Sequence, residues 1–347
     1  MVDDPTPDRR PRWRRWLRQI PAVDRLAQRL FSPSFEGAWL YRQDVVSWLY
    51  DRELRRQLPW PYRTFAAFAA LQRPFWDDVV WGYPFVRAAG AVSRRLGHLD
   101  AVPIAVGDRV AHVSLRDPRF LQVPNELASD RADTRVLRHF LRPGDSFVDI
   151  GANHGTFSIV AAHLVGAGGA LVAVEPQPRL AALVGRSLEA NAPDAARTVL
   201  PVALGDAPGV LRLHVPRGSS GSATALDTAL ADADVDTFEG PVRRLDDALD
   251  WRSLPGAVFV KLDVEGAEGA VLRGATDFVA GRAPTLMMEI NPSRIASADG
   301  SVALLDVLRA LGYTGYAELD APHDVRPLDA IGLTPQRNVI LLHGAAR

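Results

Sequence analysis

The sequence predicts an α/β fold in which a mostly parallel β-sheet has helices on both faces. From about residue 145 onward, apolar strand segments alternate with helical segments, beginning with a strand at 147–150, a helix at 157–164 and a strand at 170–174. The strands are apolar along their whole length, which is typical of a sheet buried on both faces. Hydrophobic residues make up 47% of the chain, enough for a sizeable core.

The other elements follow from the same apolar patterns. Segments 102–106 and 110–115 flank a Gly-Asp turn and predict a β-hairpin ahead of the sheet. Residues 206–246 interrupt the alternation with a short strand at 210–215 and a polar Ser/Gly loop at 219–222. Further strands are expected at 198–202, 258–262, 285–290, 316–319 and 339–342, and further helices at 134–141, 179–190, 267–273 and 302–311.

Two domains are expected, because 347 residues exceed the length of an average domain. Residues 1–98 form a helical, basic and aromatic region with seven of the eight Trp residues, and residues 99–347 form the α/β domain. The basic, Trp-containing segment 9–18 has two interpretations, a peripheral contact with an anionic membrane surface or a solvated helix start. The region as a whole is expected to shape the mouth of a site or to form a homodimer.

Composition excludes several classes of protein. The net charge of −1 offers no overall attraction for nucleic acid. The chain has no Cys, which excludes disulfides and thiolate metal sites. Neither a secretory signal nor an uncharged apolar run of membrane-spanning length is recognisable. We therefore expect a cytoplasmic protein that binds no nucleic acid.

The loop after the first strand of the sheet carries the main binding signal. Asp149 lies near the end of this strand, and Gly151, Ala152, Asn153 and Gly155 follow before the next helix begins. Glycines at this position let a ligand approach the backbone at the carboxyl edge of the sheet, where ligands of such folds bind.

The next strand ends in Glu175, 20 residues after Gly155, and its carboxylate can accept hydrogen bonds from both hydroxyls of a ribose. A dinucleotide and an adenosyl cofactor both fit this arrangement. Asn153, however, replaces the middle glycine of the G-x-G-x-x-G fingerprint of dinucleotide sites. The carboxylate of Asp149 favours a ligand with an ammonium and a sulfonium, and S-adenosylmethionine is therefore the preferred cofactor.

Two further residues are assigned to cofactor binding. Asp206 follows the third strand, where an acidic side chain can accept a hydrogen bond from the adenine amino group, and Ala203 lies in the same segment. Asn125 and Glu126 precede the sheet and are candidates to close over the methionine end.

Lys261 is the only lysine among the 40 Lys and Arg residues, and it lies near the end of an apolar strand. Unlike Arg, Lys can lose its proton when it is buried. Lys261 has two chemical roles open to it: an amine of lowered pKa that takes a hydroxyl proton, or a cation that stabilises an alkoxide and orients Asp263 or Glu289. The structural alternative is an ion pair between Lys261 and Glu289. His154 is a further candidate base, with local packing as its alternative.

Oxygen ligands suit Mg²⁺, and Asp263, Glu265 and Glu289 are the residues that could hold it. Without further evidence for such a site, we expect no metal. Asp263 is also assigned to the cofactor, while Glu268 is expected to be a first-turn carboxylate that the helix dipole favours.

With these residues the chain resembles the FkbM family of S-adenosylmethionine-dependent methyltransferases. The resemblance covers roughly residues 101–345 and implies a class I, Rossmann-like methyltransferase fold with seven strands, the last antiparallel. It also implies methyl transfer to a hydroxyl, usually on a sugar, glycolipid or polyketide-type natural product. The matching segments are 147–155, 174–176, Leu188, Asn191, 202–206, 245–247, 261–268 and 288–290.

Other functions are weighed against this one. Methyltransferases of nucleic-acid amino groups typically carry Asn/Asp-Pro-Pro-aromatic after the fourth strand, where this chain has residues 263–266. A hydride-transferring oxidoreductase would need the glycine that Asn153 replaces. An amine or protein acceptor, and a methyltransferase fold kept as a non-catalytic binding module, are the remaining alternatives.

Overall fold

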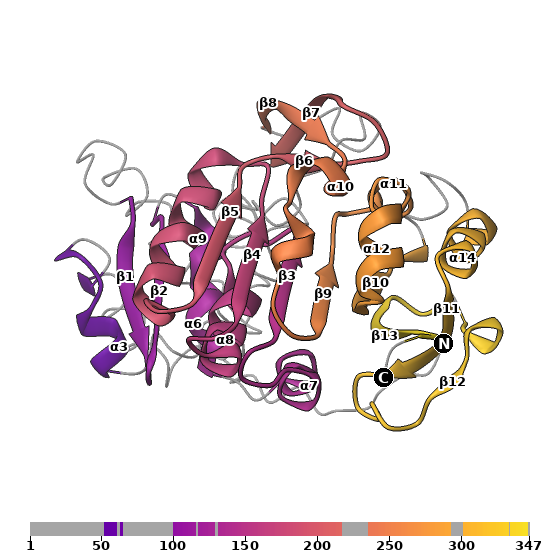
Figure 1. The fold of residues 1–347 in the computed structure, drawn as a ribbon. Coiled ribbons are helices and arrows are strands. Elements are labelled where there is room, and N and C mark those ends of the chain that lie inside the picture. Colours follow the sequence, from indigo (N-terminus) through magenta and orange to yellow (C-terminus); the bar gives the residue numbers. More distant parts are fainter. Residues whose placement is uncertain are drawn as a thin grey trace, which may run out of the picture. The chain divides into compact units, whose positions relative to one another are not determined.

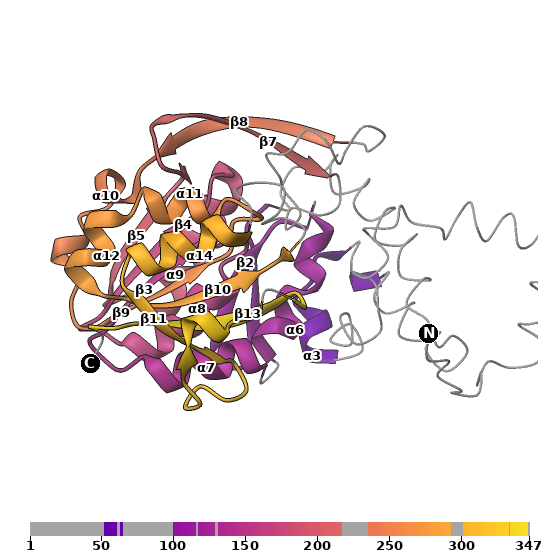
Figure 2. The ribbon, with the colours of Figure 1, turned by 90° about the vertical axis from the view of Figure 1, so that its right-hand side faces the viewer.

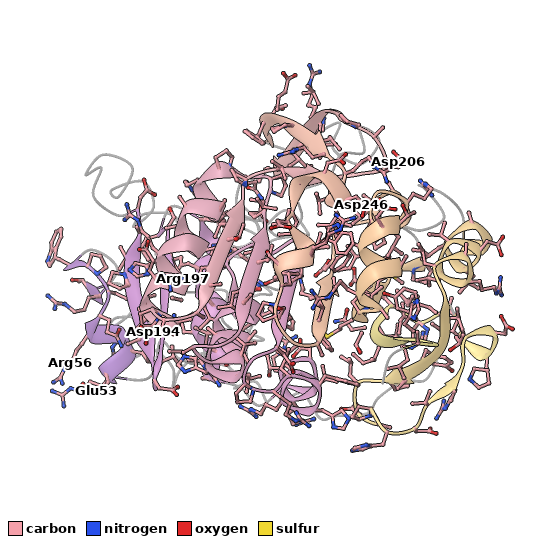
Figure 3. The ribbon with its side chains drawn as sticks, viewed as in Figure 1. Glu53, Arg56, Asp194, Arg197, Asp206 and Asp246 are labelled. Carbon is pink, nitrogen blue, oxygen red and sulfur yellow. The ribbon has the colours of Figure 1, made fainter. Side chains whose placement is uncertain are left out.

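A computed structural model describes residues 52–60, 63–64, 100–115, 117–128, 131–216, 235–292, 301–332 and 334–345 of the chain. The chain divides into two compact units, Met1–Asp100 and Ala101–Arg347. Helix α3 (Arg52–Arg56) belongs to the first unit, and its Glu53 and Arg56 form a surface ion pair at 2.7 Å (Figure 3). The basic segment 9–18 and the loop 219–222 lie outside the described residues. Within the described residues, no helix combines the length and the apolar character needed to cross a bilayer.

The main sheet of the second unit has eight strands in the described residues, in the order β12-β11-β13-β10-β9-β3-β4-β5 (Figure 1). Strands β3, β4, β5, β9 and β10 are parallel, whereas β13 is antiparallel to both of its neighbours. The predicted seven strands with an antiparallel last strand are confirmed, and β12 adds a two-residue edge. The strands are β3 (Ser146–Ile150), β4 (Ala170–Val174), β5 (Ala196–Leu200), β9 (Val258–Leu262), β10 (Thr285–Ile290), β11 (Tyr313–Glu318), β12 (Arg326–Pro327) and β13 (Arg337–His343).

Helices cover both faces of this sheet (Figures 1 and 2). All residues of β3, β4 and β9 are buried, as their apolar sequences require. On one face Val148 and Val260 belong to a core with Leu272 and Phe278 of the covering helices. Helices α7 (Ala132–Phe140), α8 (Thr156–Val165) and α9 (Pro178–Asn191) lie on one side, and α10 (Leu245–Ala248), α11 (Glu268–Arg273), α12 (Thr276–Arg282) and α14 (Ser301–Ala310) on the other.

Strand β5 departs from the expectation in two ways. It was expected to be apolar and buried, but its first three residues are exposed because β5 is an edge strand with a single neighbour. It ends at Leu200 rather than at 202, because Pro201 has no N–H with which to extend the pairing.

Smaller elements lie outside the main sheet. The predicted hairpin is confirmed, and the second half of the 206–246 segment forms a long strand that the sequence did not indicate. The hairpin is β1 (Val102–Val106) and β2 (Arg109–Val113), the one-turn helix η6 (Pro118–Leu121) and α6 (Val123–Ala128) follow it, and a separate sheet consists of β6 (Ala203–Leu204), β7 (Gly209–Pro216) and β8 (Val235–Arg243).

Polar side chains of α9 hold the hairpin through its open edge. Asn191 accepts from the N–H of Val110 at 3.0 Å and donates to the carbonyl oxygen of Val110 at 2.6 Å. The hydroxyl of Ser187 accepts from the N–H of His112 at 2.9 Å. These bonds replace the partner strand that an exposed β edge otherwise invites.

Replacing Asn191 by Leu should release this edge. The N–H and carbonyl groups of Val110 would lose their partners, which typically costs about 1–3 kcal/mol. Amide hydrogen exchange at Val110 should become faster, while exchange in β3 and β4 stays unchanged. Glu189→Ala, an exposed change in the same helix, serves as the control, and equal exchange at Val110 in both variants would contradict this account of the hairpin.

Candidate active site

The loop between β3 and α8 has a backbone that few residues can adopt. Gly151, Asn153 and Gly155 have positive φ angles of 80°, 52° and 75°. A Cβ atom on Gly151 would lie 1.9 Å from the carbonyl oxygen of Asp263, so no side chain fits there. The glycine therefore allows the β3 loop to lie directly against the chain that leaves β9.

The N–H groups of this loop already have partners inside the chain. Those of Gly151 and Ala152 both donate to the carbonyl oxygen of Val174, at 2.9 and 3.0 Å. The N–H of Gly155 donates to the carbonyl oxygen of Ala152 at 2.7 Å. The loop is thus tied to the end of β4 and closed on itself.

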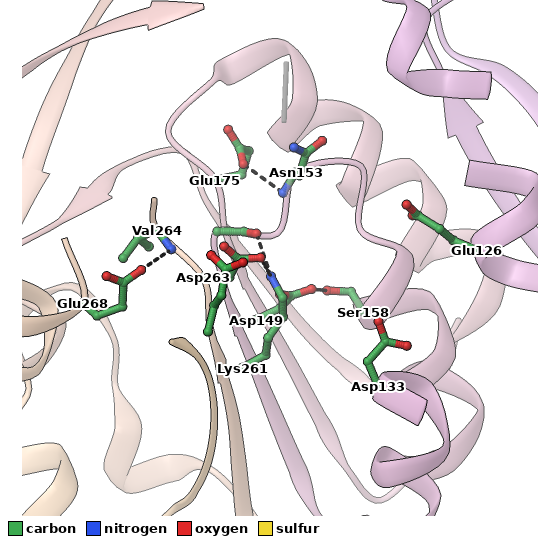
Figure 4. A network of polar contacts seen from close by, with 12 residues as sticks. Glu126, Asp133, Asp149, Asn153, Ser158, Glu175, Lys261, Asp263, Val264 and Glu268 are labelled. Atoms are coloured by element: carbon green, nitrogen blue, oxygen red, sulfur yellow. Dashed lines mark hydrogen bonds and ion pairs between the residues drawn. The ribbon is translucent and has the colours of Figure 1, made fainter. Parts of the chain in front are cut away.

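Glu175 is anchored by two backbone amides. Its Oε2 accepts from the N–H of Asn153 and its Oε1 from the N–H of Gln177, both at 2.9 Å (Figure 4). Each carboxylate oxygen keeps a second lone pair, so the side chain can accept two more hydrogen bonds. Burial raises the pKa of Glu175 to about 7, against the lowering effect of these amides. The two amides fix the orientation of the carboxylate and leave it able to accept hydrogen bonds from a ligand with two adjacent hydroxyls.

Lys261 is buried between two carboxylates. Its Nζ lies 3.6 Å from Oδ1 of Asp149 and 3.4 Å from Oδ2 of Asp263, and it donates to the carbonyl oxygen of Gly151 at 3.1 Å (Figure 4). Asp149 and Lys261 are directly opposite each other on the paired strands β3 and β9. The ring of Phe157 lies 5.1 Å from Nζ on a further side.

These contacts favour a cation at Lys261. Burial by itself would lower the pKa of the ammonium, but the charges of Asp263 and Asp149 outweigh it and raise the pKa above its ordinary value. The alternative of a neutral amine that takes a proton therefore loses support. The ion pair with Glu289 considered from the sequence is wrong, since the carboxylates within 4 Å of Nζ in the described residues belong to Asp149 and Asp263.

The two carboxylates around Lys261 differ in access. Asp149 is fully buried, and its Oδ2 accepts from the hydroxyl of Ser158 in α8 at 2.6 Å. The side chain of Asp263 is 38% exposed at the end of β9. Asp149 therefore holds the lysine, while Asp263 is the carboxylate that a second substrate can reach.

Two other predicted carboxylates have local partners. Glu289 lies in β10 just beyond its pairing with β9, accepts from Gln336 at 2.7 Å, and has a pKa raised by burial. Glu268 opens α11 as expected, but it is buried and its Oε1 accepts from the N–H groups of Val264 and Gly266, at 3.2 and 3.3 Å. Glu268 thus shapes the loop after β9, as the sequence had not indicated. No group of three or more His, Asp or Glu residues in the described part of the chain is placed to hold a metal ion.

His154 is buried in the loop between β3 and α8, residues 151–155, which the sequence assigns to the cofactor. Its Nδ1 lies 2.5 Å from Oδ1 of Asn153, and burial lowers its pKa to about 4. Because an efficient general base has a pKa near the working pH, these surroundings support the predicted catalytic role poorly. They suit a neutral side chain that contacts a ligand.

At the far end of the carboxyl edge, Asp206 follows the buried residue Ala203 of β6. Oδ2 of Asp206 accepts from Nε of Arg273 at 3.2 Å, so part of its capacity is already used. Asp246 lies nearby (Figure 3) and accepts from the N–H groups of Asp277 and Phe278, which gives it a structural role at the start of α12.

Sequence reasoning missed Ser158, and of the polar residues that precede the sheet it identified Asn125 and Glu126 but not Asp117, Arg119 and Gln122. Ser158 lies one turn into α8, and nothing in its spacing from Asp149 indicates their hydrogen bond. Asp117, Arg119 and Gln122 lie in a short irregular segment whose position against α8 is set by tertiary packing.

The chain is similar in sequence to known proteins. A family profile described as the methyltransferase FkbM domain matches residues 149–314. The 31-O-demethyl-FK506 methyltransferase FkbM of Streptomyces tacrolimicus is 32% identical, over 62% of this chain and 88% of the relative.

Two solved structures are also similar. The methyltransferase FkbM from Methylobacillus flagellatus has a TM-score of 0.34 and 16% identity, over 83% of this chain and 72% of that one. An S-adenosylmethionine-dependent O-methyltransferase from Thermotoga maritima has a TM-score of 0.32 and 13% identity, over 65% and 72%.

The burial of Glu175 predicts a specific pH dependence of stability. Its pKa is about 7 when folded and 4.5 ordinarily, so the stability present below pH 4.5 is lost as the pH rises through 7. Glu175→Gln removes this loss. Relative to the unchanged protein, the variant should gain up to about 3 kcal/mol of unfolding free energy between pH 5 and pH 8.

Urea unfolding at a series of pH values measures this difference. The variant also loses a hydrogen bond from a backbone amide, but that cost does not depend on pH. A difference between the two proteins that stays constant from pH 5 to pH 8 would show that Glu175 titrates normally.

Proposed function

Because the chain belongs to the FkbM methyltransferase family, we propose that it is an S-adenosylmethionine-dependent O-methyltransferase that acts on a hydroxyl of a sugar, a glycolipid or a natural product. The relative from Streptomyces tacrolimicus is named as a 31-O-demethyl-FK506 methyltransferase, which supports an oxygen acceptor for this chain. The choice among the three acceptor classes rests on the family resemblance.

The hydrogen bonding of the cofactor loop is the observation that carries the proposal. Within the loop 151–155, the N–H groups of Gly151, Ala152, Asn153 and Gly155 all donate to acceptors inside the chain. The pyrophosphate of a dinucleotide binds through free N–H groups at this position of the fold. A loop whose donors are used favours an adenosyl cofactor, which needs close backbone approach and a ribose acceptor here.

In this proposal the residues at the carboxyl edge of the sheet each bind a different part of the cofactor. The two free lone pairs of the Glu175 carboxylate accept from the ribose hydroxyls. Asp206 accepts from the adenine amino group with its remaining capacity, and Ala203 lines the same end. Gly151 lets the loop lie directly against the chain after β9, which brings the loop next to Asp263.

S-adenosylmethionine supplies a methyl group that its sulfonium already activates. The protein must align the acceptor oxygen with that group, which provides most of the rate acceleration, and must remove one proton. Asp263 is the accessible carboxylate beside Lys261, and it accepts the proton of the acceptor hydroxyl. The ammonium of Lys261 orients Asp263 and stabilises the negative charge that develops on the oxygen.

Glu289 completes this end of the site. It lies at the neighbouring strand end, and the charge of Asp263 contributes to its raised pKa, so the two carboxyl groups interact. A carboxyl group that binds protons more readily than usual can receive the proton from Asp263. His154 keeps its predicted place among the catalytic candidates, with the weaker support described above.

Cofactor binding provides the direct test. S-adenosylhomocysteine should bind in the micromolar range by isothermal titration calorimetry, and NAD should not bind. Glu175→Ala should weaken S-adenosylhomocysteine about 10- to 100-fold, because it removes the ribose acceptor. Binding of NAD without S-adenosylhomocysteine would overturn the cofactor assignment.

A labelled-methyl assay with sugar, lipid and protein fractions then tests the acceptor. Label on a hydroxyl supports the proposal, while label on an amine or on protein selects the alternative acceptors. Cofactor binding with no transfer to any fraction favours a non-catalytic binding module.

Lys261→Arg should separate catalysis from binding. The positive charge persists, but the larger planar group cannot occupy the buried space between Asp149 and Asp263 in the same geometry. Turnover should fall about 100-fold, while the affinity for S-adenosylhomocysteine changes little. Arg309→Lys, a change between the same residue types in a surface ion pair with Asp306 and Asp329, is the matched control. Full turnover in Lys261→Arg would remove Lys261 from the reaction.

A further inference from the structure

A second polar cluster lies beside the cofactor loop, at the N-terminus of α8. The segment of η6 and α6 contacts this helix and brings its side chains to the loop. Figure 4 shows Glu126 of α6 and Glu175 on either side of Asn153. We name as the α8 cluster the side chains of Asp117, Arg119, Gln122, Glu126 and His154.

The cluster presents two hydrogen-bond donors. Nη2 of Arg119 donates to Oε1 of Glu126 at 2.7 Å, and this pair is largely buried. Nη1 of Arg119 is buried without a hydrogen-bond partner in the described residues, and so is Nε2 of Gln122, whose side chain is 3% exposed. Residues three apart lie on the same side of a 3₁₀-helix, so Arg119 and Gln122 share one face. Buried donors without an acceptor are rare in native proteins, and their presence here indicates a ligand.

The cluster also presents two acceptors that face each other. Oδ1 of Asn153 only accepts hydrogen bonds, so Nδ1 of His154 carries the proton and Nε2 has a free lone pair. Nε2 lies 3.8 Å from Oδ2 of Asp117, and the low pKa of His154 keeps the ring neutral at pH 7. Two acceptors in this position need a shared donor with more than one proton, such as an ammonium.

The charges of the cluster and of its neighbour Arg179 balance. Burial alone would raise the pKa of Glu126, but the charge and hydrogen bond of Arg119, together with other partners, have the larger combined effect, so the pKa lies below its ordinary value. Glu126 is therefore ionised and cancels the charge of Arg119. Arg179, which is half exposed, approaches the carboxylate of Asp117 at 3.9 Å. With Arg179 counted against Asp117, the cluster and its neighbour have no net charge. Such a site with both donors and acceptors suits a zwitterion better than a phosphate.

We infer that the α8 cluster binds the amino-acid end of S-adenosylmethionine, a zwitterion of one carboxylate and one ammonium. Arg119 and Gln122 donate to the carboxylate. Asp117 and His154 accept from the ammonium. This assignment rests on the proposed function, because it requires that the adenosyl part of the same ligand lies on Glu175.

The position of the cluster agrees with this assignment. Asn153 donates its N–H to Glu175 and receives His154 on its side chain, so a single residue separates the ribose acceptor from the cluster. A ligand that crosses the loop from Glu175 therefore reaches the α8 cluster with its other end. The carboxylate of the methyl acceptor is the competing ligand, and the test below distinguishes the two.

Three ligands that differ only at the amino-acid end test the inference by calorimetry on the full chain. S-adenosylhomocysteine has both charged groups, its decarboxylated analogue keeps only the ammonium, and methylthioadenosine has neither. Arg119→Gln should weaken S-adenosylhomocysteine by about tenfold or more and leave the other two within about twofold. Asp117→Asn should weaken the first two ligands and leave methylthioadenosine unchanged.

Two further variants keep the result interpretable. Arg135→Gln in α7 removes an exposed arginine outside the cluster and should change none of the three affinities. Gln122→Leu, which alters no charge, should repeat the pattern of Arg119→Gln on a smaller scale if the arginine variant does not fold.

The outcomes separate the inference from the proposed function. An equal loss for all three ligands in Arg119→Gln, or no loss for any, would overturn the inference and leave the cofactor assignment intact. Unchanged protein that binds S-adenosylhomocysteine no more tightly than methylthioadenosine would do the same. Failure of all three ligands to bind the unchanged protein would overturn the proposed function itself.

Discussion

The buried ammonium of Lys261 holds together the parts of the site that come from different strands. It joins β9 to β3 through Asp149, to the cofactor loop through the carbonyl oxygen of Gly151, and to the substrate side through Asp263. Removing one partner of a buried charge pair leaves an uncompensated charge, which is far costlier than losing a surface pair. The same contacts explain why a chain that otherwise uses Arg keeps one Lys. A compact ammonium can contact three oxygens around a point, whereas a guanidinium spreads its donors over a plane.

The loop between β3 and α8 lies next to this network. We attribute its ligand specificity to backbone N–H groups that already donate to acceptors inside the chain. Because β4 and Glu175 take the N–H groups of the loop, an anionic ligand finds few donors there, while a ligand that brings its own hydroxyl donors finds an oriented acceptor. The pKa of Glu175 is raised to about 7 because burial withdraws the carboxylate from water, and this effect outweighs the two backbone amides that lower the pKa. The sequence alone identifies Glu175 as a hydrogen-bond acceptor, but only the fold shows that the backbone N–H groups beside it already have partners inside the chain.

Local sequence patterns were sufficient to predict the main sheet and the loop between β3 and α8. The apolar runs at β3, β4 and β9 identify a doubly covered sheet because no other environment accepts strands without a polar face. The same logic fails at β5, where an apolar pattern does not reveal that the strand has one neighbour, and at β8, which pairs with β7 across a segment of low sequence regularity. Lys261 was identified by its rarity, and Asp263 was correctly named as a partner. Glu289 was wrong and Asp149 was not anticipated, because the register that places Asp149 opposite Lys261 is a property of strand order. The α8 cluster was missed except for Glu126 and His154, since its members come from segments joined only by tertiary contacts.

The distribution of unpartnered buried atoms around the loop supports the idea that one ligand unites these parts. Within the described residues, the buried side-chain atoms without a hydrogen bond include four from the loop, the strand before it or the segment that packs on α8: Asp149 Oδ1, His154 Nε2, Arg119 Nη1 and Gln122 Nε2. Further such atoms lie elsewhere, namely Arg109 Nε, His112 Nδ1 and Trp251 Nε1. A folded chain tolerates such atoms where they serve function. Asp149 has the ammonium of Lys261 nearby, so its charge is compensated without a ligand. Glu126 compensates the charge of Arg119, but Nη1 of Arg119 and Nε2 of Gln122 have no acceptor in the described residues. Donors without an acceptor favour the α8 cluster, rather than the strand ends, as the place for a bound carboxylate.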